Sequence, residues 1–73
     1  MEKIHIAYWH GTQFKDLPYG HNTTHDYSLE TRNQIIDTCL EKGYSVMIRP
    51  ASKPNWEFEG ILIWIDNGRF GQR

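Results

Sequence analysis

The sequence predicts a small α+β domain with one helix and three β-strands, in the order strand, helix, strand, strand. Three observations support this fold class: residues 2–9 alternate in polarity, residues 28–42 have the apolar spacing of an amphipathic helix, and residues 61–65 are continuously apolar. Alternation is typical of a half-buried strand, whereas a short apolar run rich in β-branched residues is typical of a strand buried on both faces. We therefore expect a single βαββ domain.

The last strand is predicted to be the centre of the sheet. In the stretch EFEGILIWID, residues 57–66, Ile61, Ile63 and Ile65 would line one face while Leu62 and Trp64 line the other. Because both faces of this strand carry large apolar side chains, both require cover, which favours a central position. Ile63 is accordingly expected among the most buried residues.

The other two strands are predicted on either side of it. Residues 2–9 and 44–49 both alternate, and residues 50–55 contain two prolines and are expected to connect the second strand to the third. The expected sheet is a three-stranded mixed sheet in the order 1-3-2. In it the second and third strands form an antiparallel hairpin, the first strand is antiparallel to the third, and a right-handed helical crossover makes the first parallel to the second.

The helix is predicted to begin after Ser28, a good N-cap, and to end before Gly43, which suits the position after a helix. Its apolar stripe should pack on one face of the sheet. The stripe consists of Leu29, Ile35, Ile36, Cys39 and Leu40.

Size and composition limit the classes of function. The 73 residues form one domain, 1–73, with a long polar loop at 11–27 and a short tail at 67–73. The net charge of −1 disfavours nucleic-acid binding by a global positive field. The single Cys39 excludes an internal disulfide, and no membrane span or leader is recognisable, so we expect a cytoplasmic protein.

The sheet face opposite the helix is the strongest functional indication. It would carry an aromatic and apolar patch with an arginine and a histidine at its rim, larger than a monomer usually exposes. Its predicted partner-binding residues are His5, Trp9, Met47, Arg49, Leu62 and Trp64. The alternative is that the loop 11–27, or the tail with Phe70, folds across this face and buries it.

A second alternative is single-stranded nucleic-acid binding on the same face. Trp9 and Trp64 would stack on bases, and basic side chains would contact phosphates. Those basic side chains are Arg49, Lys53, Arg69 and Arg73.

Metal binding and catalysis are both weakly indicated. His10, His21 and His25 could supply nitrogen ligands, but the segment holding the last two is a poor helix former, so their spacing does not place them on one face. Cys39 lies in the middle of the predicted helix, where a structural thiol is expected, and no glycine-rich phosphate loop follows a strand. We expect no cofactor and no enzymatic activity.

The sequence thus predicts a small protein-binding module, such as an inhibitor, an adaptor or a phage-encoded accessory protein. Its partner would be another protein or a second copy of the chain, which would make a homodimer. Binding would use the sheet face with its tryptophans and the adjoining loop.

Overall fold

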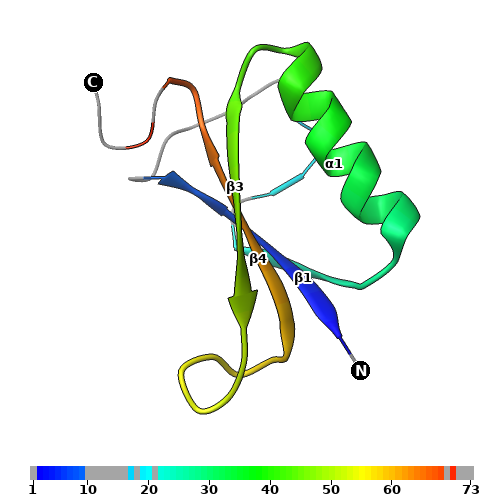
Figure 1. The fold of residues 1–73 in the computed structure, drawn as a ribbon, viewed down its shortest axis with the longest axis vertical. Coiled ribbons are helices and arrows are strands. Elements are labelled where there is room, and N and C mark those ends of the chain that lie inside the picture. The colour runs from blue at the N-terminus through cyan, green and yellow to red at the C-terminus, as the bar shows by residue number, and fades with distance from the viewer. Residues whose placement is uncertain (1, 10–16, 18, 21, 69, 71–73) are drawn as a thin grey trace.

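The computed structural model describes residues 2–9, 17, 19–20, 22–68 and 70. They form a four-stranded mixed sheet with one helix on one of its faces (Figure 1). In chain order the elements are β1 (Lys3–Tyr8), β2 (Thr23–Asp26), α1 (Leu29–Glu41), β3 (Ser45–Ala51) and β4 (Gly60–Asp66). Their order across the sheet is β2-β1-β4-β3, which confirms the predicted place of the last strand between the first strand and the strand before it.

The prediction of three strands is wrong, because a fourth strand lies in the region predicted as loop 11–27. Strand β2 pairs antiparallel with β1, with Ile6 opposite Thr23 and Lys3 opposite Asp26. Its four residues, TTHD, are all polar and are half-buried or exposed. The sequence therefore shows no alternation of apolar and polar residues from which this strand could be predicted. The strand forms because β1 offers a free edge of backbone groups, which pair with any extended neighbour whatever its side chains.

Because of this fourth strand, β3 and β4 run in the opposite direction relative to β1 from the one predicted. Strand β1 is parallel to β4, with Ile6 opposite Ile63, whereas the sequence predicted an antiparallel pair. The β3–β4 hairpin is antiparallel as predicted. Since β2 returns the chain before the helix begins, the crossover through α1 joins β2 to β3, the two edge strands, and not β1 to its neighbour.

Strand β3 continues beyond its predicted end, through Pro50 to Ala51. The sequence predicted that Pro50 could not belong to a strand interior. Proline is tolerated in an edge strand when its missing N–H would face away from the sheet, and β3 is an edge strand.

The helix begins and ends as predicted. The backbone N–H of Thr31 donates to the Ser28 hydroxyl at 3.0 Å, and Gly43 follows the C-cap Lys42 with φ +82°. The predicted stripe is wrong in part: Ile35 and Cys39 are buried, whereas Leu29 and Leu40 are 60% and 59% exposed. At 3.6 residues per turn, the two leucines lie roughly 100° around the axis from Ile35 and Cys39, and the sheet covers only the face with the latter pair.

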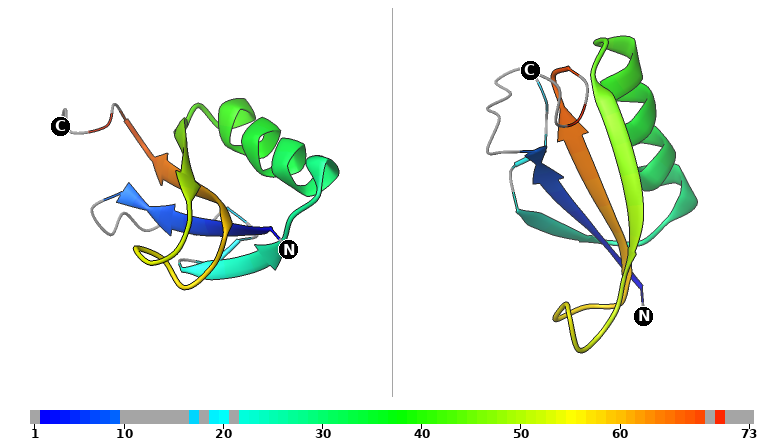
Figure 2. Two further views of the ribbon diagram at one scale, coloured as in Figure 1. Left: turned by 60° about the horizontal axis from the view of Figure 1, so that its bottom comes forward. Right: turned by 60° about the vertical axis from the view of Figure 1, so that its left-hand side comes forward.

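The main core lies between α1 and the sheet, as predicted. Its buried residues are Ile4, Ile6, Tyr8, Leu17, Ile35, Cys39, Ile63 and Ile65. Figure 2 shows α1 along one side of the twisted sheet and the loop between β3 and β4, residues 52–59, curling away from the helix. The helix therefore covers one face of the sheet, and the loop 52–59 lies on the side of the opposite face.

A candidate binding groove on the open sheet face

The open face is built from two rows of side chains that cross the sheet. Trp64 of β4 lies opposite Ala7 of β1 and Met47 of β3. In the next row, Leu62 of β4 lies opposite His5 of β1 and Arg49 of β3. Because side chains alternate along each strand, both rows point away from the helix.

The β3 and β4 members of these rows contribute to a shallow groove of about 370 Å³. The residues that line it are Trp9, Met47, Arg49, Pro50, Trp56, Leu62 and Trp64. Leu62 is buried, Trp64 and Met47 are half-buried, and Arg49, Pro50 and Trp56 are exposed. The groove therefore has an apolar floor and a rim that reaches solvent along β3.

At one end of the groove the aromatic rings support one another. Trp9 contacts both Trp64 and Phe70 edge to face, with ring centroids 5.4 Å apart in each pair. Edge-to-face contact is the preferred geometry for aromatic pairs and adds roughly 0.5–1.5 kcal/mol to their burial. Trp9 and Trp64 thus pack against each other. Phe70 of the tail contacts this face through Trp9, but Trp9 and Trp64 remain half-buried, so the contact falls short of the burial that the alternative predicted.

At the other end the loop 52–59 folds onto the face. Phe58 stacks on His5 with ring centroids 5.2 Å apart and lies 5.9 Å from Trp56. Phe58 also packs against a small buried cluster of Ala7, Ala51 and Leu62. The sequence predicted a connection at 50–55 and placed residues 57–59 in the last strand, but β4 begins at Gly60 and residues 52–59 form a loop that partly covers the open face.

The described part of the loop 11–27 does not cover this face. Leu17 is buried in the core on the helix side, and Tyr19 packs there too, while the Tyr8 hydroxyl donates to the backbone carbonyl of Tyr19. The alternative in which this loop buries the open face is wrong for these two residues. Phe14 and Pro18, which would also have covered the face, lie outside the described residues.

A polar border lies beyond the groove, toward β2. Nδ1 of His5 lies 2.8 Å from the Thr24 hydroxyl, and the Lys3 ammonium forms an ion pair with Asp26. The hydrogen bond and the charge of Lys3 hold the pKa of Asp26 below its usual 3.8. His5 is thus held by a neighbouring strand and by Phe58, and it does not reach the groove.

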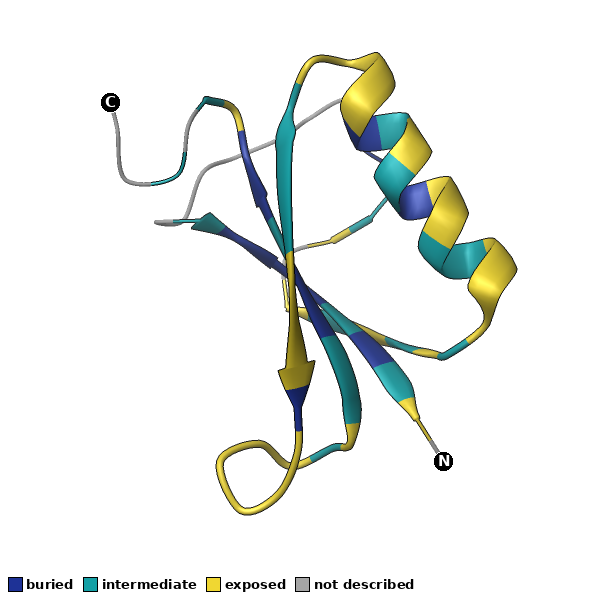
Figure 3. Cartoon of the chain, viewed as in Figure 1, coloured by how far each residue is buried: buried dark blue, intermediate teal, exposed yellow. Residues whose placement is uncertain are grey.

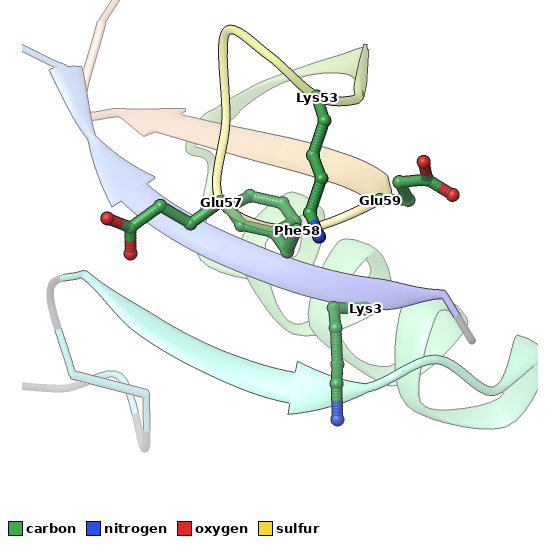
Figure 4. Close-up of a pocket in the computed structure, with 5 residues that line it drawn as sticks. All are labelled: Lys3, Lys53, Glu57, Phe58 and Glu59. Atoms are coloured by element: carbon green, nitrogen blue, oxygen red, sulfur yellow. The ribbon is translucent and has the colours of Figure 1, made fainter.

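A second hollow, of about 310 Å³, lies at the base of the loop and is lined by charged side chains. Figure 4 shows Lys53 reaching over Phe58, while Glu57 and Glu59 point outward in opposite directions. Lys3 completes this lining, so two lysines are balanced by two glutamates. This part of the surface has no excess of positive charge.

Five of the six predicted partner-binding residues line the groove together: Trp9, Met47, Arg49, Leu62 and Trp64. His5 lines an adjoining pocket with Trp56 and Phe58. Sequence reasoning missed Pro50, because it was assigned to the connection 50–55, and Trp56, because it falls between that connection and the stretch 57–66. The available signal was the pair of aromatic residues, Trp56 and Phe58, between two strands expected to form a hairpin, since burial of their rings favours folding of the loop onto a face of the sheet.

The residues of the nucleic-acid alternative are only partly together. Arg49 lies in the groove with Trp9 and Trp64, but Lys53 lines the separate hollow at the base of the loop. Arg69 and Arg73 lie outside the described residues.

The candidate metal ligands are not assembled in the part of the chain that the structure describes. His10 and His21 lie outside it, and Nε2 of His25 is 3.0 Å from the Thr23 hydroxyl. Among the described residues no three His, Cys, Asp or Glu side chains are grouped as a metal would require. Burial raises the pKa of Cys39 to about 11, so its thiol is protonated at neutral pH and is a poor nucleophile.

The comparisons with known proteins add no relative. No family model matches the chain, and neither the curated proteins nor the solved structures contain a match. Within the described ranges, no helix has the length and apolar character needed to cross a membrane.

Proposed function

We propose that this chain is a small non-enzymatic binding module whose groove receives part of a protein partner, in the manner of an inhibitor or adaptor. The groove itself is the observation on which the proposal depends. Three tryptophans, a methionine and a leucine line it beside one arginine, and its rim is open to solvent. Tryptophan and arginine are the residues most enriched among those that dominate the energy of protein interfaces.

The arrangement of the tryptophans supports this use. Trp9 and Trp64 hold each other edge to face and form a rigid wall, whereas Trp56 on the loop is 37% exposed. A rigid aromatic wall binds with little loss of side-chain freedom, and an exposed ring gains by leaving water when a partner covers it. The groove therefore offers both a prepared surface and an anchor.

The distribution of charge favours protein over nucleic acid as the partner. Nucleic-acid sites follow the backbone with several cations, because phosphate contacts dominate affinity. Within the described residues the groove contains one cation, Arg49, and the adjoining hollow is balanced in charge. Single-stranded nucleic acid is therefore the less favoured partner, and its binding would be detected by the salt dependence described below.

The proposal is tested by selecting displayed random nine-residue peptides on the immobilised protein and measuring the selected peptides in solution. Trp56→Ala should weaken their binding by about 2 kcal/mol, roughly 30-fold, because it removes the exposed anchor. Leu40→Ala is the matched control, since Leu40 is 59% exposed on the helix and lies away from the groove. It should leave the affinity unchanged.

Two further measurements distinguish the other partners. Between 50 and 300 mM salt, peptide affinity should change little, whereas binding of a fluorescent oligo-dT that falls steeply with salt would favour nucleic acid. Sedimentation of the protein alone would reveal a homodimer, and a dimer that Trp56→Ala dissociates would make a second copy the partner. Peptides that bind Trp56→Ala as tightly as the wild type would contradict the proposal.

A further inference from the structure

The groove opens onto a free edge of the sheet. Strand β3 lies at the end of the sheet order. Three consecutive residues in its second half, Ile48, Arg49 and Pro50, are all exposed. Figure 3 shows this lower half of β3 as an exposed segment of the strand, well away from α1. Two of these residues, Arg49 and Pro50, also line the groove.

The hydrogen bonds of the neighbouring strands determine which backbone groups of β3 face outward. The Lys3 N–H donates to the Glu59 carbonyl at 2.8 Å, so along β4 the odd-numbered residues face β1 and the even-numbered ones face β3. In the register of the hairpin, Leu62 is opposite Arg49 and Trp64 is opposite Met47. Arg49 and Met47 therefore bond to β4, and the alternate residues of β3 direct their backbone groups away from the sheet.

Those alternate residues are Val46, Ile48 and Pro50. Pro50 agrees with this assignment independently, because proline has no N–H and is tolerated in a strand where that group would face outward. In the exposed half of β3, the N–H and carbonyl of Ile48 and the carbonyl of Pro50 are thus directed to the free edge. A further strand could pair with them.

The side chains around this edge specify what such a strand must carry. On the open face an added strand would lie beside Met47 and Arg49, and directly opposite side chains approach to roughly 5 Å. Arg49 has no ion pair within the described part of the chain, so a carboxylate is complementary to it. On the other face the added strand would lie beside Ile48, which is 37% exposed and favours an apolar neighbour.

We propose that the β3 edge binds an extended peptide segment of a partner protein, in which an apolar residue and a carboxylate stand two positions apart. This inference depends on the proposed function, and it specifies that the partner binds as an extended strand. The apolar side chain enters the groove, the carboxylate pairs with Arg49, and the residue between them packs on Ile48. Strand addition gives affinity through main-chain bonds and specificity through alternate side chains.

The composition of β3 argues against a second copy as the added strand. Strand β3, SVMIRPA, contains no carboxylate, so pairing two copies edge to edge leaves both arginines without a counter-charge. Antiparallel pairing about Ile48 would also place Val46 opposite Pro50, which cannot donate. The other edge of the sheet, β2, is only four residues long and polar.

The test uses a synthetic peptide, acetyl-Thr-Lys-Leu-Val-Asp-Lys-Thr-amide, and the full chain labelled with ¹⁵N. In the free protein, the Ile48 amide should exchange with solvent faster than those of Met47 and Arg49, which bond to β4. Saturating peptide should slow exchange at Ile48 at least about tenfold. N-methylation along the peptide should abolish binding at alternate residues only, since only every second N–H faces β3.

The charge requirement is tested by a double-mutant cycle. Replacing the aspartate of the peptide by asparagine should weaken binding to the wild type roughly tenfold, as expected for a hydrogen-bonded charge pair. The variant Arg49→Gln should bind the two peptides alike. Equal affinities of both peptides for the wild type would overturn the charge pairing.

Other results separate this inference from the proposed function. If the peptide shifts the indole resonances of Trp56 and Trp64 while the Ile48 amide stays unprotected, the groove binds but the edge does not, and the inference fails alone. Failure of the displayed peptides to depend on Trp56 would remove the proposed function as well. Protection of Ile48 that rises with protein concentration in the absence of peptide would show edge pairing between copies and would contradict the inference.

Discussion

The two faces of the sheet differ in what covers them. On the helix side, eight buried residues from β1, α1, β4 and the segment before β2 form one cluster. On the open side the buried cluster contains, among the described residues, only Ala7, Ala51 and Leu62, with Phe58 and Trp64 packed against it. The sheet thus carries a larger core on the face toward the helix and a thin apolar layer on the other.

The residue types explain the difference. The helix-side positions of β4 are Ile61, Ile63 and Ile65, which pack densely against a helix, while the open-side positions carry Leu62 and Trp64. Large aromatic rings retain favourable contact with one another even when partly wet. The difference indicates that the helix side supplies most of the stability of this domain, and it agrees with the proposal that the open side receives a partner.

The largest predicted effect comes from a substitution that would disturb the pairing of β1 with β4 and so destabilise both faces of the sheet. A Cβ added at Gly60 would lie 2.0 Å from the Lys3 carbonyl oxygen, and the φ of +150° is strained for any other residue. Backbone strain and overpacking each cost about 1–3 kcal/mol, so we expect Gly60→Ala to destabilise the domain by roughly 2–6 kcal/mol. The free energy of unfolding in urea measures this loss.

Gly43→Ala is the control for this substitution. Gly43 also has positive φ, +82°, but nothing lies within 4 Å of an added Cβ. The cost should therefore be the left-handed conformation alone, about 1–2 kcal/mol. If Gly60→Ala cost no more than this, the close contact of β4 with β1 would not be required for folding.

The next prediction compares the two faces directly, using adjacent residues of β4. Ile63 is fully buried under the helix, as predicted from its central position, and Leu62 is buried on the open face. Ile63→Ala should cost about 2–5 kcal/mol, and Leu62→Ala should lie near the lower limit of that range because the thin open-side layer can collapse onto the gap. Chemical denaturation of both variants checks the order.

A reversed order would contradict the comparison. If Leu62→Ala were the more destabilising substitution, the open face would be a second full core and would be poorly suited to bind a partner. Ile35→Ala on the buried face of α1 should resemble Ile63→Ala, since both side chains belong to the helix-side cluster.

The smallest predicted effect concerns the polar border of the open face. The pKa of Asp26 is lowered by Lys3, so the pair stabilises the fold at pH values above the ordinary carboxyl pKa, and this contribution is lost as pH falls through the lowered value. In Lys3→Met the pKa of Asp26, followed by NMR, should rise toward 3.8. An unchanged titration curve would show that the pair does not persist in solution.

The identities of the helix and of strands β1, β3 and β4, the alternation of faces and the central place of the last strand follow from the sequence alone. They are local or nearly local properties: Ile61, Ile63 and Ile65 fall on one face of any strand, and Ser28 caps a helix by bonding to the backbone three residues later. The sequence also predicted that Trp9, Met47, Arg49, Leu62 and Trp64 share one face through alternation, and these five line the groove together with Pro50 and Trp56.

The tertiary structure decided what depends on distant partners. Residues 23–26 carry no apolar pattern and become a strand only because the edge of β1 is free to pair with them. That one strand reverses the direction of β3 and β4 relative to β1. The rotation of α1, which leaves Leu29 and Leu40 in solvent, and the folding of Trp56 and Phe58 onto the open face likewise depend on which surfaces meet. Backbone pairing and packing are not encoded in the side chains of one segment, because the partner surface exists only after the chain has folded.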